Sequence, residues 1–213
     1  MEAKQNNLIK SLRIQPLIVV IRLEHNFFNL SKKKENLLSK IEKLSNFGIK
    51  NIEIGWDSNP EWVNLILEIK KRFKSINIGV ASISSRQSLE SILSLDVNYS
   101  MSQFFNKEIH IQAIEYNQLV IPGISNIENF KKAIDLGYKI VKIFPASKLG
   151  INFINELKDF KKKDIFFIGA GGIKSKDLKK FLKSGYDALV IGRELRNQTP
   201  DKDLEIWLSL IHI

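Results

Sequence analysis

The sequence contains no cysteine, which excludes disulfide bonds, thiolate metal sites and a cysteine nucleophile. It also lacks an apolar run long enough to cross a membrane, since even the run 17–23 is interrupted by Arg22. The first ten residues include Glu2 and several other polar residues without an apolar centre, which is not the pattern of a secretory signal. We therefore expect a cytoplasmic protein with no membrane partner.

The composition is that of a folded globular chain, with 44% hydrophobic and 26% charged residues among 213. This length fits one domain, residues 1–213, and lies within the range of single-domain α/β barrels. The formal net charge is +10, but the lysines are spread over apparent helix faces and form no stripe interleaved with aromatic residues. We therefore expect no nucleic-acid partner, and a basic surface would instead attract an anionic substrate.

Short β-type runs alternate with amphipathic helical segments along the whole chain. The runs are Leu17–Ile21, Asn51–Ile54, Ile76–Ala81, Tyr99–Ser102, Leu119–Ile121, Ile140–Phe144, Ile165–Ile168 and Ala188–Ile191. Eight strands, each followed by a helix, predict a (β/α)8 TIM barrel, and residues 2–14 predict an extra N-terminal helix that covers its bottom. A doubly wound open sheet is the alternative. No strand is followed by the Gly-x-Gly-x-x-Gly turn that many such sheets carry.

Two charged residues interrupt these apolar runs, Glu53 in the second and Lys142 in the sixth. Barrels place their chemistry at the C-terminal ends of the strands, where both residues lie. Apolar surroundings lower the pKa of a lysine, which makes its amine a nucleophile for carbonyl carbon, and a nearby carboxyl group can then move protons. Two simpler interpretations stay open: a lysine that extends its ammonium to water, and a structural ion pair between the two residues.

Other candidate binding residues stand at or just after the ends of strands. They are Arg22, Ser82, Phe144, Gly171, Gly172 and Arg193. The two glycines follow the seventh strand, where barrels commonly bind phosphate through free backbone N–H groups, although any tight turn can also use such glycines.

Several segments together resemble the family of 2-keto-3-deoxy-6-phosphogluconate (KDPG) and 4-hydroxy-2-oxoglutarate (KHG) aldolases. These segments are Val19–His25, Asn51–Ile54, Leu119–Ser125 (LVIPGIS), Val141–Ala146 (VKIFPA) and Gly171–Ile173. They follow the family's order across nearly the whole chain.

The resemblance implies a homotrimeric barrel that needs no metal or other cofactor and cleaves 2-oxo sugar acids to pyruvate and an aldehyde. It implies that Lys142 is the Schiff-base lysine and Glu53 the acid/base residue of a class I aldolase. The expected substrate is KDPG, cleaved to pyruvate and glyceraldehyde 3-phosphate in Entner–Doudoroff carbohydrate metabolism. KHG, which would give pyruvate and glyoxylate, is a second expected substrate.

The chain departs from the family pattern at several positions around the expected site. Asp57 stands where the family usually has an arginine that binds the substrate carboxylate, although Arg22 could supply a positive charge instead. Gln103 replaces a usual proline, Ser147 a common glutamate, and Glu194 follows Arg193 where a serine is expected. Two further hypotheses therefore stay open: another phosphate-binding barrel such as a thiamin-phosphate-synthase-like transferase, and a non-catalytic binding protein.

Overall fold

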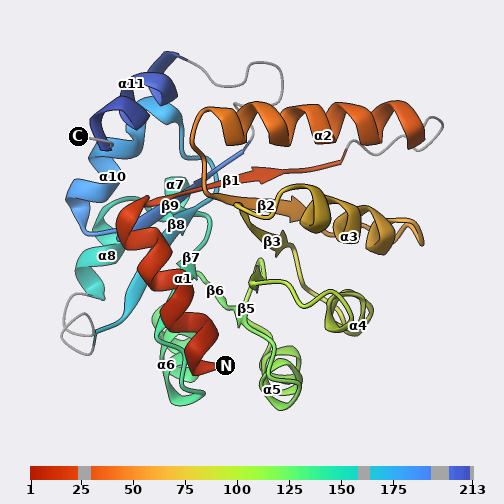
Figure 1. The fold of residues 1–213 in the computed structure, drawn as a ribbon. Helices are drawn as coiled ribbons and strands as arrows, with labels where there is room; N and C mark the ends of the chain where they lie inside the picture. The colour runs from red at the N-terminus through yellow and green to blue at the C-terminus, as the bar shows by residue number, and fades with distance from the viewer. Residues whose placement is uncertain (24–29, 158–163, 193–201, 212–213) are drawn as a thin grey trace.

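The computed structural model describes residues 1–23, 30–157, 164–192 and 202–211 (Figure 1). Its strands are β1 (Leu17–Ile21), β2 (Asn51–Gly55), β3 (Asn77–Ala81), β4 (Tyr99–Met101), β5 (Val120–Ile121), β6 (Gly123–Ile124), β7 (Ile140–Ile143), β8 (Phe166–Ala170) and β9 (Ala188–Ile191). All neighbouring strands pair in parallel, in the order β5-β4-β3-β2-β1-β9-β8-β7-β6. The predicted barrel of alternating strands and helices is confirmed.

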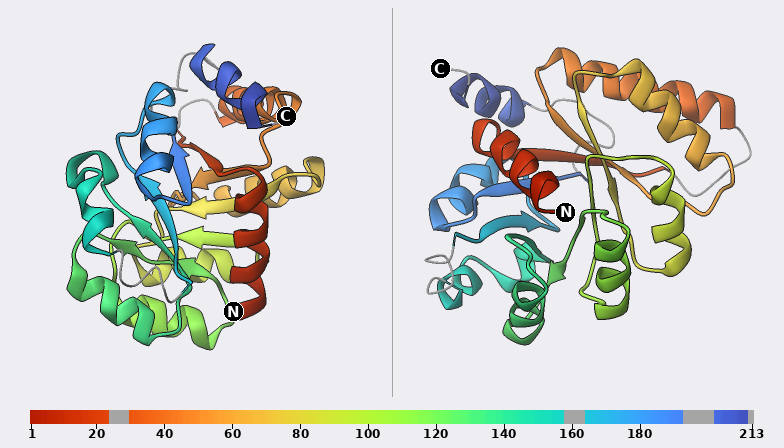
Figure 2. Two further views of the ribbon diagram at one scale, coloured as in Figure 1. Left: turned by 90° about the vertical axis from the view of Figure 1, so that its left-hand side faces the viewer. Right: turned by 60° about the horizontal axis from the view of Figure 1, so that its bottom comes forward.

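Helices connect the strands and surround them on the outside (Figures 1 and 2). They are α1 (Glu2–Ile14), α2 (Leu30–Asn46), α3 (Trp62–Arg72), α4 (Arg86–Leu93), α5 (Lys107–Glu115), α6 (Ile127–Asp135), α7 (Ala146–Leu149), α8 (Asn152–Glu156), the 3-10 helix η2 (Ser175–Asp177), α10 (Leu178–Ser184) and α11 (Lys202–Ile211). Their apolar faces are buried against the strands, as at Ile41 and Leu44 of α2. Within the described residues, none of these helices has the length and apolar character needed to span a membrane.

The fifth predicted strand, Leu119–Ile121, corresponds to β5 and ends before Pro122, and the additional segment β6 follows the proline, which explains why nine strand segments replace the eight expected ones. Proline has no N–H to donate, so a strand ladder is interrupted where it occurs. β5 pairs with β4 on one side of Pro122, and β6 pairs with β7 on the other. The Pro122 carbonyl accepts the Lys142 N–H at 2.9 Å, and Ser102 Oγ accepts the Gly123 N–H at 3.0 Å. The chain itself therefore joins the two ends of the sheet and closes the ring.

The helix α1 has the predicted bounds and lies across the N-terminal end of the barrel, its bottom (Figure 2). Ser11 Oγ donates to Asn51 Oδ1 at 2.9 Å, where β2 begins. The Lys139 N–H, just before β7, donates to Gln5 Oε1 at 2.7 Å. Because strand starts on different sides of the barrel are tied to one helix, α1 closes the bottom. The opposite end remains as the mouth.

Candidate active site

Lys142 lies on β7 with its side chain inside the barrel and only 7% of the residue exposed. Its Nζ forms no hydrogen bond with the described part of the chain and stands 5.4 Å from the centroid of the Phe144 ring. Burial lowers the pKa of Lys142 to about 8, the charge of Glu53 opposes this change, and the charge of Arg22 adds to it. The amine is therefore partly neutral near pH 8, as a nucleophile requires.

Glu53 lies on β2 and is 2% exposed. Its Oε1 atom is buried and has no hydrogen-bond partner among the described residues. Burial raises the pKa of Glu53 to about 7, while the positive charges of Lys142 and Arg22 act in the opposite direction. A carboxyl group with this pKa can both accept and return a proton near neutral pH.

The two groups share the interior of the barrel without forming a salt bridge. The salt bridges of the described residues all involve exposed or partly exposed side chains elsewhere, and none joins Lys142 to Glu53. Burial drives both groups toward their neutral forms, and their mutual attraction only partly reverses this. The geometry thus differs from both simpler interpretations, because the Lys142 side chain is buried and it is not paired.

Arg22 and Ser82 form a polar rim above this pair. Arg22 Nη1 donates to Ser82 Oγ at 3.0 Å, which links the ends of β1 and β3. Ser82 has a φ of 70°, a left-handed conformation that is uncommon for a residue other than glycine and that concentrates at functional sites. Arg22 is near enough to act on the charges of Glu53 and Lys142, and Ser82 is joined to the site through Arg22.

Asp57 lies in the loop after β2, on the same side of the barrel. Its Oδ1 accepts the Asn59 N–H at 2.9 Å, and the loop is anchored where Trp62 Nε1 donates to the Gly55 carbonyl at 3.0 Å. The half-buried carboxylate of Asp57 is thus held in an ordered turn at the mouth.

The two loop glycines are packed against the segment that follows Lys142. Gly171 and Gly172 have φ values of 92° and 75°, which side chains rarely tolerate. A Cβ on Gly171 would stand 2.7 Å from the Phe144 ring, and one on Gly172 would stand 2.1 Å from Ser147 Oγ. Phe144 and both glycines are therefore brought together next to Lys142. Arg193 and Glu194 lie outside the described residues.

Two aromatic residues near the site were not predicted from the sequence. Phe104 is 55% exposed after β4, and its ring meets Phe144 edge-on at 5.7 Å. Tyr99 is fully buried inside the barrel on β4. The only sequence signal for Tyr99 was its period-two position in a predicted strand, which does not distinguish a core residue from a functional one.

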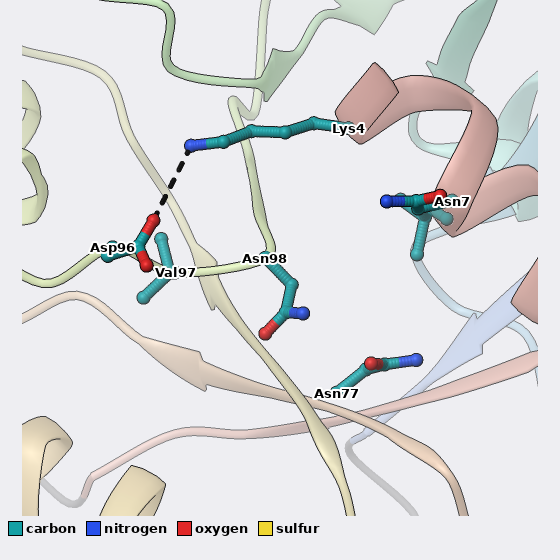
Figure 3. Close-up of a pocket in the computed structure, with 7 residues that line it drawn as sticks. Lys4, Asn7, Asn77, Asp96, Val97 and Asn98 are labelled. Atoms are coloured by element: carbon teal, nitrogen blue, oxygen red, sulfur yellow. Dashed lines mark ion pairs between the residues drawn. The ribbon is translucent and has the colours of Figure 1, made fainter.

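A separate cavity of about 170 Å³ lies at the opposite end of the barrel (Figure 3). Its lining includes Lys4 and Asn7 of α1, Asn77 at the start of β3, and Asp96 and Asn98 before β4. Figure 3 shows the ion pair between Lys4 and Asp96, with 3.8 Å between the charged atoms. Since Asn77 begins the strand that ends near Ser82, this cavity is not part of the Lys142 site.

Comparisons with known proteins show which family the chain matches. The sequence model of the family described as KDPG and KHG aldolase matches residues 8–205. The 2-dehydro-3-deoxy-6-phosphogalactonate aldolase of Escherichia coli (strain K12) is 22% identical over 182 residues, which are 84% of each chain.

Solved structures of similar proteins share the fold. The 2-keto-3-deoxy-6-phosphogluconate aldolase of Zymomonas mobilis ZM4, solved with 3-phosphoglycerate, has a TM-score of 0.76 at 18% identity, over 95% of this chain and 94% of that one. The KDPG aldolase of Legionella pneumophila, with pyruvate captured as a covalent carbinolamine intermediate, has a TM-score of 0.73 at 20% identity, over 95% and 93%.

Proposed function

The chain belongs to the KDPG and KHG aldolase family, and from this premise we propose that it is a class I aldolase in which Lys142 forms the Schiff base and Glu53 carries the protons. The family makes it an aldolase-like lyase. The observation that carries the assignment of residues is the buried amine of Lys142, which has no hydrogen-bond partner among the described residues and shares the barrel interior with an equally unpaired Glu53.

The proposed reaction begins when the neutral Lys142 amine attacks the C2 keto carbon of the substrate and water leaves to give an iminium ion. The iminium ion draws electrons as the C3–C4 bond breaks, while Glu53, through a water molecule, takes the proton of the C4 hydroxyl group. The aldehyde departs and an enamine of pyruvate remains. Glu53 then returns a proton to C3, and hydrolysis of the imine releases pyruvate and restores the amine.

We propose a phosphorylated 2-keto-3-deoxy sugar acid as the substrate, with KDPG the first candidate. The phosphogalactonate analogue in the name of the Escherichia coli relative is an equal test compound. Arg22 and Ser82 are the proposed ligands of the substrate carboxylate. Gly171, Gly172 and Arg193 are the proposed phosphate ligands. Kinetic comparison of both compounds with KHG tests this choice, and faster turnover of KHG would overturn it.

Borohydride trapping tests the lysine directly. With pyruvate present, reduction is expected to leave one pyruvyl adduct on Lys142, detected by mass spectrometry of peptides. Lys139→Ala, which changes an exposed lysine three positions away, should trap pyruvate as the parent protein does, whereas Lys142→Ala should trap none. A parent protein that remains unmodified at Lys142 under these conditions would refute the proposal.

Turnover separates this proposal from a non-catalytic binding protein, which the charge reversal at Asp57 suggests. Cleavage of a phosphorylated sugar acid that is lost in Lys142→Ala excludes the binding protein. Substrate binding without turnover in the parent protein would support the non-catalytic binding protein.

Of the remaining expectations, the trimer and the pathway rest on the family resemblance, and the location rests on the composition. We propose a homotrimer and a cytoplasmic location, with a role in the Entner–Doudoroff route. Light scattering of the purified protein tests the first of these, since a monomeric mass would contradict it.

A further inference from the structure

Two polar atoms inside the barrel lack hydrogen-bond partners among the described residues: Oε1 of Glu53 and the hydroxyl oxygen of Tyr99. Glu53 is 2% exposed and Tyr99 is 0% exposed. A buried polar atom without a partner is costly, and most such atoms in native proteins are paired directly or through a water molecule. Each of these two atoms therefore requires an explanation.

The strand register places the two residues in one row across the sheet. Glu53 of β2 pairs with Gly79 of β3, and Gly79 pairs in turn with Tyr99 of β4. Gly79 leaves the space between them free of a side chain. A Cβ at Gly79 would lie 2.4 Å from Cζ of Tyr99 and 2.5 Å from its Cε2 atom. The hydroxyl end of the Tyr99 ring thus lies over Gly79, on the side of Tyr99 that faces β2 and Glu53.

We infer that the Tyr99 hydroxyl group donates to Glu53 Oε1 through one water molecule, since the two atoms do not bond each other directly, and that Tyr99 is a positioning residue for the proton carrier. This inference rests on the proposed role of Glu53. The bond satisfies both buried atoms at once. It also fixes the carboxylate, so that Oε2 is the oxygen left to serve the substrate beside Lys142.

The charges around Glu53 are consistent with this role. The charged groups that act on Glu53 are Lys142 of β7 and Arg22 after β1, and both stabilise its ionised form. Burial, and to a smaller extent the charge of Glu53, raise the pKa of Tyr99 well above its ordinary value. Tyr99 thus stays a neutral donor throughout the pH range in which Glu53 titrates. A donor to the carboxylate stabilises the ionised form further.

The test is the titration of Glu53 in the Tyr99→Phe protein, which keeps the ring over Gly79 and removes only the hydroxyl group. We expect the Glu53 carboxyl group to become about tenfold weaker as an acid. Carbon-13 NMR of labelled glutamate carboxyl groups measures this without substrate, and the Glu53 signal is the one lost in Glu53→Gln. Gly79→Ala, which displaces the ring but keeps the hydroxyl group, should weaken the acid in the same direction.

Tyr186→Phe is the matched control. Tyr186 is also buried, its hydroxyl group also lacks a partner among the described residues, and its pKa is raised by burial alone. This variant should leave the Glu53 titration unchanged. In the active enzyme, Tyr99→Phe should move the acid limb of the kcat profile to higher pH with little change in KM, which a purely structural role would not do.

An unchanged Glu53 titration in Tyr99→Phe, in a protein that still traps pyruvate at Lys142, would overturn the inference and leave the proposed function intact. A changed Glu53 titration in a protein that traps no pyruvate at Lys142 would support the contact between Tyr99 and Glu53 and would overturn the proposed function. The same change in Tyr99→Phe and Tyr186→Phe would also overturn it, because the effect would then be general to the core.

Discussion

At the bottom of the barrel, Gln15 is 2% exposed and uses both ends of its amide, whereas at the mouth Glu53 is equally buried and its Oε1 has no partner. Gln15 Nε2 donates to the Gly48 carbonyl at 2.8 Å, and its Oε1 accepts the Lys50 N–H at 2.8 Å. Gln5, also buried, bridges the Gly137 carbonyl and the Lys139 N–H in the same way, at 3.2 and 2.7 Å.

The difference shows how one fold separates stability from chemistry. Neutral amides that are hydrogen-bonded at both the oxygen and the nitrogen tie the N-terminal segment to the starts of the strands, and their burial carries little penalty. Ionisable groups at the mouth are buried without full compensation, which shifts the pKa values of Glu53 and Lys142 toward the neutral range. Changes to Glu53 or Lys142 should therefore reduce activity and spare or raise stability. Changes at the bottom should reduce stability and leave activity nearly unchanged.

Among the changes predicted here, Glu53→Gln should have the largest effect on activity and on stability. We expect kcat to fall by a factor on the order of 10² to 10⁴, since the amide cannot carry protons. The folded pKa of Glu53, about 7, is above the ordinary 4.5, so its protonation stabilises the fold fully below pH 4.5. That contribution is lost as pH rises through about 7.

The stability of Glu53→Gln relative to the parent protein should therefore increase between pH 4.5 and 8, by about 3 kcal/mol from this titration alone. Urea unfolding at several pH values measures it. A variant that becomes less stable than the parent as pH rises would break the comparison, because it would show that the buried carboxylate is well compensated.

Gln15→Ala is the corresponding change at the bottom. It leaves the Lys50 N–H and the Gly48 carbonyl without their partner, and we expect a loss of about 2 to 4 kcal/mol in the free energy of unfolding. Kinetics at a temperature where the variant is folded should show kcat and KM within about twofold of the parent, because no residue of the mouth has changed. Gln15→Glu, which keeps one acceptor, should lose less stability than Gln15→Ala at acidic pH, where it is protonated. A loss of activity without a loss of stability would contradict the assignment of the bottom to folding.

The sequence was most informative where a local pattern determines the structure. Short apolar runs that alternate with amphipathic helical segments predicted the barrel, and the α1 bounds were predicted to the residue, because these depend on neighbours along the chain. The strand segment after Pro122 was not predicted, since these residues resemble a turn and become a strand only by pairing with β7. The pairing of β6 is a long-range effect that no local pattern contains.

The candidate site was predictable residue by residue but not as a set of contacts. Lys142 and Glu53 interrupt apolar strands, which sequence reasoning detects directly. The bond from Arg22 to Ser82, the packing of Ser147 against Gly172, and the Tyr99 ring over Gly79 all depend on which strands are neighbours and on their register. Those facts follow only from the closed barrel.

Asp57→Arg should give the smallest effect and sharpens the comparison within the mouth itself. The change replaces a negative by a positive charge beside the proposed carboxylate site, so we expect KM for a 2-oxo acid to fall about fivefold. Because Lys142 and Glu53 are untouched, kcat should change little. The cost in stability should be about 1 kcal/mol, since it reflects the loss of one partly buried loop hydrogen bond from the Asn59 N–H. Asp57→Asn keeps that acceptor and removes only the charge, and it should lower KM by a smaller factor.

Equal KM values in the parent and both variants would show that the substrate carboxylate does not approach this loop. Arg22 and Ser82 alone would then bind the substrate carboxylate. In that case Arg22→Gln should raise KM by the same factor in the parent protein and in both Asp57 variants.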